Sequence, residues 1–305
     1  MKNLKRIILA AVLTASAMVC LTGCGKKNVK GAGGVAVKVE NPNYDMAGYA
    51  VDKQVKEDGT VVITYALLGT HEDKIEYLYM DQIENNPKVD KHLTTNKELE
   101  DIYGLKYKSS CGEWNQQVAA MENYITGNHM TIEAVNDIPV YKKNSEETMV
   151  PKKGSELAAA CDIDISSFIK VINEAYEGRE EVFGRAMAVG EDIRVNNHKG
   201  TLDVNIAFVC TDYEYKVCFS HLKTYSFDAD SDENGIILEV NSEDKDNFEE
   251  YMYGRNMVAI REVETYSSAD GEMLALPKKG TELADVCHID LYYLLKALNE
   301  ASLRL

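Results

Sequence analysis

The most chemically suggestive stretch of the chain surrounds its only tryptophan, in the sequence CGEWNQQ at 111–117. A tryptophan offers a large apolar face and one hydrogen-bond donor, and a neighbouring carboxylate adds a charge. Together they suit a wall on which a ligand stacks. The candidate ligand-binding residues are Tyr103, Glu113, Trp114 and Gln117. The alternative is structural: Glu113 favours a helix start through the helix dipole, and Trp114 anchors that helix in the core.

Other reaction centres are not visible in the sequence. It contains no G-x-S-x-G, H-E-x-x-H, Walker or dinucleotide-binding motif, and no histidine lies four residues from another. No pair of cysteines has the CxxC spacing of a zinc knuckle or redox motif. We therefore predict no catalytic residue and no metal site, and we favour a non-enzymatic role. A hydrolase whose acidic pair meets only in the folded chain stays open as a lesser alternative.

The N-terminus predicts export and lipid anchoring. A basic start is followed by the apolar stretch 7–19, which is too short to span a bilayer as a mature helix. The next residues, LTGC, resemble the lipobox of bacterial lipoproteins, which implies cleavage after residue 23 and diacylation of Cys24. Residues 1–23 are then a signal peptide and 24–34 a flexible tether. We expect a lipid-anchored protein on the extracytoplasmic face of the bacterial cell membrane.

Charge narrows the choice of partners. The chain of 305 residues carries a net charge of −17, and losing the three positive charges of the signal peptide brings it to about −20. Nucleic acid and anionic lipid are poor partners for such a body. Among the remaining cysteines, Cys161 and Cys287 are expected to be small buried thiols. Cys210 and Cys218 lie where they could face each other across a hairpin.

A repeat organises the rest of the chain. The 25 residues from Pro151 to Ala175 recur from Pro277 to Ala301, with 14 identities at a constant offset of 126. We predict two tandem copies of one α+β module, an antiparallel sheet with helices, over 35–177 and 182–305, joined near 177–181. The second copy is shorter by about 14 residues, which we place in the segment 97–106.

The elements of each module follow from periodicity and turn residues. Predicted strands cover 49–55, 59–68 and 75–83 in the first module, and 200–209 and 215–222 in the second. Helices are predicted at 113–125, ended by a left-handed Gly127, and at 248–253, ended by Gly254. Further strands are predicted at 130–140 and 257–266. A final helix in each copy is expected to begin at Asp164 or Asp290.

Two resemblances can be read from these motifs. The segments KELEDIYGLK at 97–106 and GEWNQQVAAMENYITG at 112–127 look like a group of secreted and lipid-anchored proteins of clostridia-type bacteria. More distantly, the module order is similar to the extracytoplasmic FMN-binding domain, in which a threonine before the last helix carries FMN by a phosphoester. Asp162 and His288 stand at that position here, so the resemblance implies that covalent FMN is not expected.

These observations lead to one expectation with an alternative. We expect a membrane-anchored protein with two FMN-binding-domain-like modules that binds a small molecule, a glycan or an envelope protein, with no cofactor. The alternative is a lipoprotein that binds flavin noncovalently and transfers electrons.

Overall fold

The computed structural model describes residues 43–305, apart from 91, 143–147, 232–235 and 267–273. These residues belong to one compact unit. The predicted signal peptide at 1–23 and the tether at 24–34, with Cys24, lie outside the described residues.

The first half of this unit is built on an antiparallel sheet of four strands in the order β3-β2-β1-β6. The strands are β1 (Tyr44–Val55), β2 (Val61–His71), β3 (Lys74–Asn85) and β6 (Glu180–Gly184). Ten successive residues of β2 are buried, which requires that both faces of the sheet are covered. The β-branched and aromatic residues of β2 suit such a position.

The second half is built on an antiparallel sheet in the order β10-β9-β8-β7. Its strands are β7 (Ala186–Asn196), β8 (Thr201–Thr211), β9 (Val217–Asp228) and β10 (Leu238–Glu239). Each sheet has a register shift just before the turn that follows its second strand, at Gly69/Thr70 in β2 and at Cys210/Thr211 in β8. The two central hairpins therefore bend at matching positions.

Helices follow each three-stranded meander in a similar order. The first half contains η1 (Glu100–Ile102), η2 (Leu105–Tyr107), α2 (Trp114–Gly127), α3 (Ile132–Asn136), β4 (Val140–Lys142), β5 (Met149–Pro151), η3 (Leu157–Ala159) and α4 (Ser166–Glu177). The second half contains α5 (Glu243–Met252), α6 (Met257–Arg261), β11 (Thr265–Tyr266), β12 (Leu276–Pro277), η4 (Leu283–Asp285) and α7 (Tyr292–Arg304). The mixed α+β class with antiparallel sheets is confirmed.

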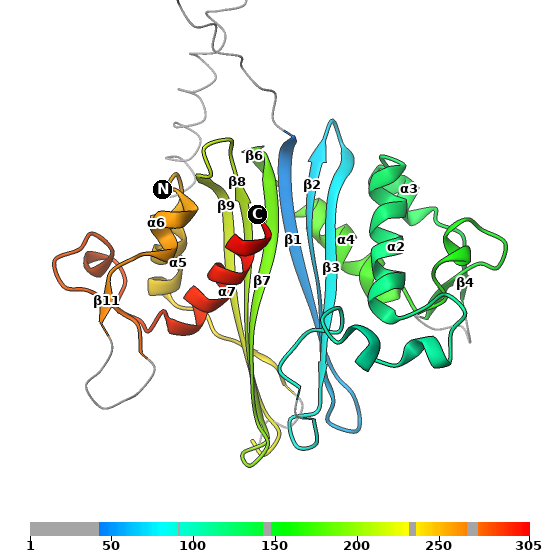
Figure 1. Cartoon of the computed structure of the whole chain (residues 1–305), viewed down its shortest axis with the longest axis horizontal. Coiled ribbons are helices and arrows are strands. Elements are labelled where there is room, and N and C mark those ends of the chain that lie inside the picture. The colour runs from blue at the N-terminus through cyan, green and yellow to red at the C-terminus, as the bar shows by residue number, and fades with distance from the viewer. Residues whose placement is uncertain (1–42, 91, 143–147, 232–235, 267–273) are drawn as a thin grey trace, which may run out of the picture. The chain divides into compact units, whose positions relative to one another are not determined.

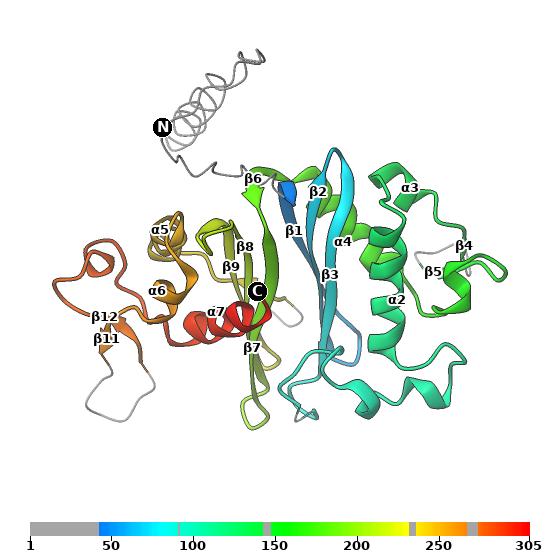
Figure 2. The same cartoon turned by 45° about the horizontal axis from the view of Figure 1, so that its top comes forward.

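The elements stack in four layers: helices, sheet, sheet, helices (Figures 1 and 2). One hydrophobic core lies between the first sheet and α2, α3 and α4, and another between the second sheet and its helices. The third core lies between the sheets and draws on β1, β2, β7, β8 and β9. Because the halves share this central core, the inner faces of the two sheets pack against each other.

Two of the predicted strands are wrong. Residues 130–140 contain helix α3, and 257–266 contain helix α6; only short strands follow each helix. Asn256 explains the second case, because its side chain accepts a hydrogen bond from the backbone N–H of Val258 and caps α6. Met257 and Ile260 are then buried at helical spacing.

The stop signals before these helices differ between the two halves. Gly127 is the last residue of α2, and it is His129 that adopts the positive φ predicted for the glycine. Gly254 follows shortly after the end of α5, as predicted, and adopts a positive φ. The remaining predicted strands and helices are confirmed within a few residues. The chain link near 177–181 leads into β6, which pairs with β1 of the first half.

Candidate functional site

The residues predicted as a ligand wall lie together in the interior of the first half. Trp114 is 5% exposed, and its ring packs against Tyr103 and Phe168 at centroid distances of 5.9 and 5.8 Å. Glu113 forms a capping box with Gln116 at the start of α2 and accepts a hydrogen bond from the backbone N–H of Leu105 at 2.8 Å. This geometry is what the structural alternative describes.

Gln117 in α2 forms hydrogen bonds to two loops, one before α2 and one before α4. Its Nε2 donates to Ser109 Oγ and to the carbonyl of Gly112, and its Oε1 accepts from the backbone N–H of Asp162 at 2.8 Å. In the second half, Asp244 accepts from the backbone N–H of His288 at 3.0 Å. The side chains of Gln117 and Asp244 thus hold corresponding loops, and a ligand role for Tyr103, Glu113, Trp114 and Gln117 stays a prediction.

The cysteines of the repeat are buried, as predicted. Burial raises the pKa of the Cys161 thiol to about 11, which keeps it protonated at neutral pH. Burial likewise raises the pKa of Cys287. Cys210 and Cys218 are unbridged: Cys210 lies opposite Phe219 in the hairpin, and the thiol of Cys218 donates to the carbonyl of Cys210 at 3.4 Å.

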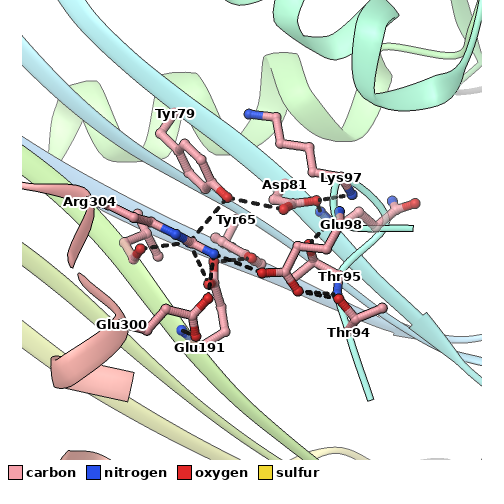
Figure 3. A network of polar contacts seen from close by, with 12 residues as sticks. Tyr65, Tyr79, Asp81, Thr94, Thr95, Lys97, Glu98, Glu191, Glu300 and Arg304 are labelled. Carbon is pink, nitrogen blue, oxygen red and sulfur yellow. Dashed lines mark hydrogen bonds and ion pairs between the residues drawn. The ribbon is translucent and has the colours of Figure 1, made fainter. Parts of the chain in front are cut away.

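A polar network connects the two halves where β3 lies beside β7 (Figure 3). We call it the Arg304 network; it contains Tyr65, Tyr79, Asp81, Glu98, Glu191, Glu300 and Arg304. The Arg304 guanidinium donates to Glu191 at 2.7 Å, to Glu98 at 2.9 Å and to Glu300 at 2.5 Å. It also donates to the carbonyl of Val189 at 2.8 Å. One cation is therefore surrounded by three carboxylates and a carbonyl.

Burial sets the electrostatics of this network. The pKa of Glu191 rises to about 7 because of burial, although the Arg304 charge opposes the rise. Burial and the neighbouring Glu191 charge raise the pKa of Glu300 to about 7. Burial raises the pKa of Asp81 to about 6, against the opposing charge of Lys97. Three carboxyl groups of this network therefore have pKa values close to neutral pH.

A second seam between the halves lies where β1 faces β9, and here the structure has an open cleft. Its volume is about 370 Å³. We call it the β1/β9 cleft; it is lined by Tyr49, Ala50, Val51, Glu174, Gly178, Glu180, His221, Lys223, Tyr225 and Glu239. Cavities that hold small ligands in proteins commonly have volumes of about 300–1,000 Å³.

Aromatic rings form one side of the β1/β9 cleft. Tyr49 and His221 stack with a centroid distance of 4.4 Å and an interplanar angle of 28°. His221 is held from behind by Glu249 at 3.8 Å and meets Glu180 at 3.3 Å. This side therefore presents a fixed planar surface beside a carboxylate.

Charged groups form the other side. Lys223 and Lys53 both bind Glu239, at 2.8 and 3.3 Å. Burial lowers the pKa of Lys223, but the hydrogen bonds and charges of Glu239 and Tyr49 together outweigh it, so the pKa lies above its ordinary value. Glu174 is exposed, and among the described residues its carboxylate has no ion-pair partner.

Strand register shows that the cleft and the network occupy corresponding places. In the first half, β2 residue Ala66 pairs with Ala50 and Met80; in the second, β8 residue Ala207 pairs with Gly190 and Leu222. Counting along β1 and β7 from these pairs matches Val51 with Glu191 and Tyr49 with Val189. Counting along β3 and β9 matches His221 with Tyr79 and Lys223 with Asp81.

The final helices complete the correspondence. The offset of 126 in the repeat matches Glu174 with Glu300 and Gly178 with Arg304. An independent ion pair supports this match, because Lys170 in α4 binds Asp52 at 2.7 Å and Lys296 in α7 approaches Asp192 at 3.6 Å. The β1/β9 cleft is therefore open where the chain has a glycine, and its counterpart is filled where the chain has Arg304.

The sequence reasoning missed both seams. Arg304 and Glu191 are far apart in the chain, and no local motif joins them. One signal was present: the repeat is followed by Tyr176-Glu177-Gly178 in one copy and by Ser302-Leu303-Arg304 in the other. The end of the final helix therefore differs between the two copies, with Gly178 in one and Arg304 in the other, which indicates that the two helix ends lie in different environments.

Comparison with protein-family models, with curated proteins and with solved structures found no match. In the part of the chain that the structure describes, no helix is both long and apolar enough to cross a membrane. No group of three or more His, Cys, Asp or Glu side chains placed to hold a metal ion occurs within 43–305, outside its gaps.

Proposed function

We propose that this chain is a lipid-anchored extracytoplasmic binding protein, and that it holds a small molecule in the β1/β9 cleft. The observation that carries the proposal is the cleft itself: a cavity of about 370 Å³ with a stacked Tyr49–His221 pair on one side and Lys223 and Glu174 on the other. Such a mixture of aromatic faces and a few polar groups is typical of ligand sites.

The proposal includes a duplicated architecture. Two copies of one sheet-and-helix module, similar to the FMN-binding domain, would pack through their sheets. The 25-residue repeat, the parallel order of elements and the matching registers of β2 and β8 support this. In a duplicated protein, one of two equivalent contacts between the halves can stabilise the fold, here the Arg304 network, while the other, here the β1/β9 cleft, binds a ligand.

The location rests on the N-terminal sequence. The LTGC motif and the apolar stretch before it support acylation of Cys24 and export. Acyl chains would hold the binding unit at the membrane surface through a tether of about ten residues, at 24–34.

Two measurements test this proposal. Intact mass and a visible spectrum of the full chain purified from membranes of its native host report the acyl group and any bound flavin together. Thermal unfolding of the same protein with amines, amino acids, sugars, nucleotides and FMN then reports binding. A ligand at about 100 times its Kd should raise Tm by about 5 °C or more.

A pair of variants assigns the binding to the cleft. Gly178→Leu places a side chain in the cleft, whereas Gly178→Ala adds only a methyl group, and the φ of −85° at this position admits either residue. We expect ligand-induced stabilisation in the wild type and in Gly178→Ala but not in Gly178→Leu. Unmodified Cys24 would contradict the anchor, and stabilisation that persists in Gly178→Leu would contradict the site.

A further inference from the structure

Building on the proposed binding function, we infer that the ligand of the β1/β9 cleft carries a guanidinium group, and that this group occupies the place taken by the side chain of Arg304 in the other seam. The protein then contains, in its own Arg304 network, an internal copy of the contact that its ligand makes.

The Arg304 network shows what this site accepts when it is filled. The guanidinium lies among Glu98, Glu191 and Glu300 and beside the ring of Tyr79, 5.9 Å from its centroid (Figure 3). A planar guanidinium suits this arrangement because it donates several hydrogen bonds in its plane and packs its face on an aromatic ring.

The β1/β9 cleft keeps the parts that would receive such a group. Glu174 corresponds to Glu300, which binds Arg304 at 2.5 Å. His221 corresponds to Tyr79 and is stacked on Tyr49, so an aromatic surface is present in both seams. Glu180, from β6, adds a carboxylate that is paired with His221 at 3.3 Å. What the cleft lacks is an arginine at the place of Arg304, where Gly178 stands; its own cation, Lys223, is bound to Glu239 at 2.8 Å.

The differences between the seams define the rest of the ligand. Val51 replaces the buried Glu191, so this part of the cleft is apolar and would contact a short hydrocarbon arm. Lys223 replaces Asp81, and both Lys223 and Lys53 are bound to Glu239. Glu174 lines the cleft and has no ion-pair partner among the described residues, so its carboxylate would bind the guanidinium of a ligand that continues as an aliphatic chain.

Titration calorimetry of the full chain with agmatine, a guanidinium on a four-carbon chain that ends in an ammonium group, tests the inference. The comparison ligand is its ureido analogue, which has nearly the same shape and the same terminal ammonium group but a neutral urea in place of the guanidinium. We expect agmatine to bind at least about tenfold more tightly, since a charge-assisted hydrogen bond is replaced by a neutral one. Equal affinities, or no binding of agmatine, would overturn the inference.

Matched variants localise the effect. Glu174→Gln should weaken agmatine binding by about tenfold or more, whereas Glu177→Gln, an exposed carboxylate on the next turn that does not line the cleft, should leave it unchanged. Gly178→Arg should abolish binding by supplying the guanidinium from the chain, and Gly178→Ala should retain it. Wild-type affinity in Gly178→Arg, with its Tm unchanged, would contradict the inference.

A reciprocal variant does not depend on the cleft variants folding. Arg304→Gly opens the other seam and leaves Glu191, Glu300 and Glu98 without their cation. Agmatine should raise the Tm of this variant by more than it raises that of the wild type, and the ureido analogue should not. Equal shifts with both compounds would contradict the inference. A neutral ligand that binds the cleft while agmatine does not would overturn it and leave the proposed function standing.

Discussion

Replacing Arg304 with leucine should destabilise the protein in a pH-dependent manner. Glu191 is 7% exposed and receives hydrogen bonds from Arg304 at 2.7 Å and from the hydroxyl of Tyr65 at 2.5 Å. Removing one partner of a buried ion pair costs about 3–5 kcal/mol. Because the Arg304 side chain is 29% exposed and water partly screens the pair, we expect about 2–3 kcal/mol at pH 8.

The pH dependence follows from the raised pKa of Glu191. Its pKa is about 7 in the folded protein and near its ordinary value, about 4.3, in the unfolded chain. The folded state therefore binds this proton more tightly. The resulting stabilisation is fully present below the unfolded pKa and is lost as the pH rises through about 7. Arg304→Leu raises this pKa further, so its penalty should shrink to about 1 kcal/mol at pH 5, where Glu191 is protonated.

Urea denaturation at pH 5, 6, 7 and 8 measures this effect, with the slope of each transition checked against that of the wild type. Arg261→Leu is the control, because Arg261 is exposed and its one side-chain hydrogen bond to a described residue is to Ser302 Oγ at 3.1 Å. It should change the free energy of unfolding by less than about 0.5 kcal/mol. Glu191→Gln added to Arg304→Leu should recover part of the loss. A penalty for Arg304→Leu that is the same at pH 5 and pH 8 would refute the reasoning.

Three further outcomes are expected. In urea denaturation, Glu113→Ala should destabilise the protein by about 1–2 kcal/mol because Glu113 caps α2, and Trp114→Ala by about 3–5 kcal/mol because Trp114 fills the core. Neither variant should change the affinity for agmatine. A selective loss of binding would instead support the prediction that these residues bind the ligand. Gly48→Ala should lower the free energy of unfolding by about 3 kcal/mol or more, because the added Cβ would lie 2.0 Å from the carbonyl oxygen of Ala175 in α4. Gly127→Ala, whose Cβ would have nothing within 4 Å, should be neutral or stabilising. Equal effects of the two substitutions would show that α4 shifts away from β1 at little cost. Cys24→Ser should remove the acyl mass and leave the protein outside the acylated membrane fraction, as mass spectrometry of cell fractions would show, and an unchanged distribution would contradict lipid anchoring.

Much of the fold could be predicted because the strands and long helices carry strong local signals. The run of β-branched and aromatic residues in β2 and the apolar stripe of α2 required no long-range information. The short helices α3 and α6 were read as strands, since apolar runs of about five residues do not distinguish the two. Only the capping side chain of Asn256 indicated a helix start, and its effect depends on the backbone that it binds.

The candidate site could not be predicted, because it is formed by packing the two halves. The sequence showed the repeat but not that the inner faces of the two sheets share one core. Glu191 lies in the largely apolar sequence AMAVGEDI, where a buried carboxylate requires a hydrogen-bond or ion-pair partner. No nearby sequence feature identifies Arg304 as that partner. The conspicuous Trp114 cluster drew attention instead, and in the fold its side chains hold loops and core together.

A crystal structure of the full chain with agmatine tests the central claim most directly. We predict that the guanidinium lies in the β1/β9 cleft, with its nitrogen atoms on Glu174 and its plane beside Tyr49 and His221. Its position should superpose on the Arg304 guanidinium when the second half is laid over the first. Agmatine bound elsewhere, or a cleft that stays empty at saturating ligand, would contradict the account.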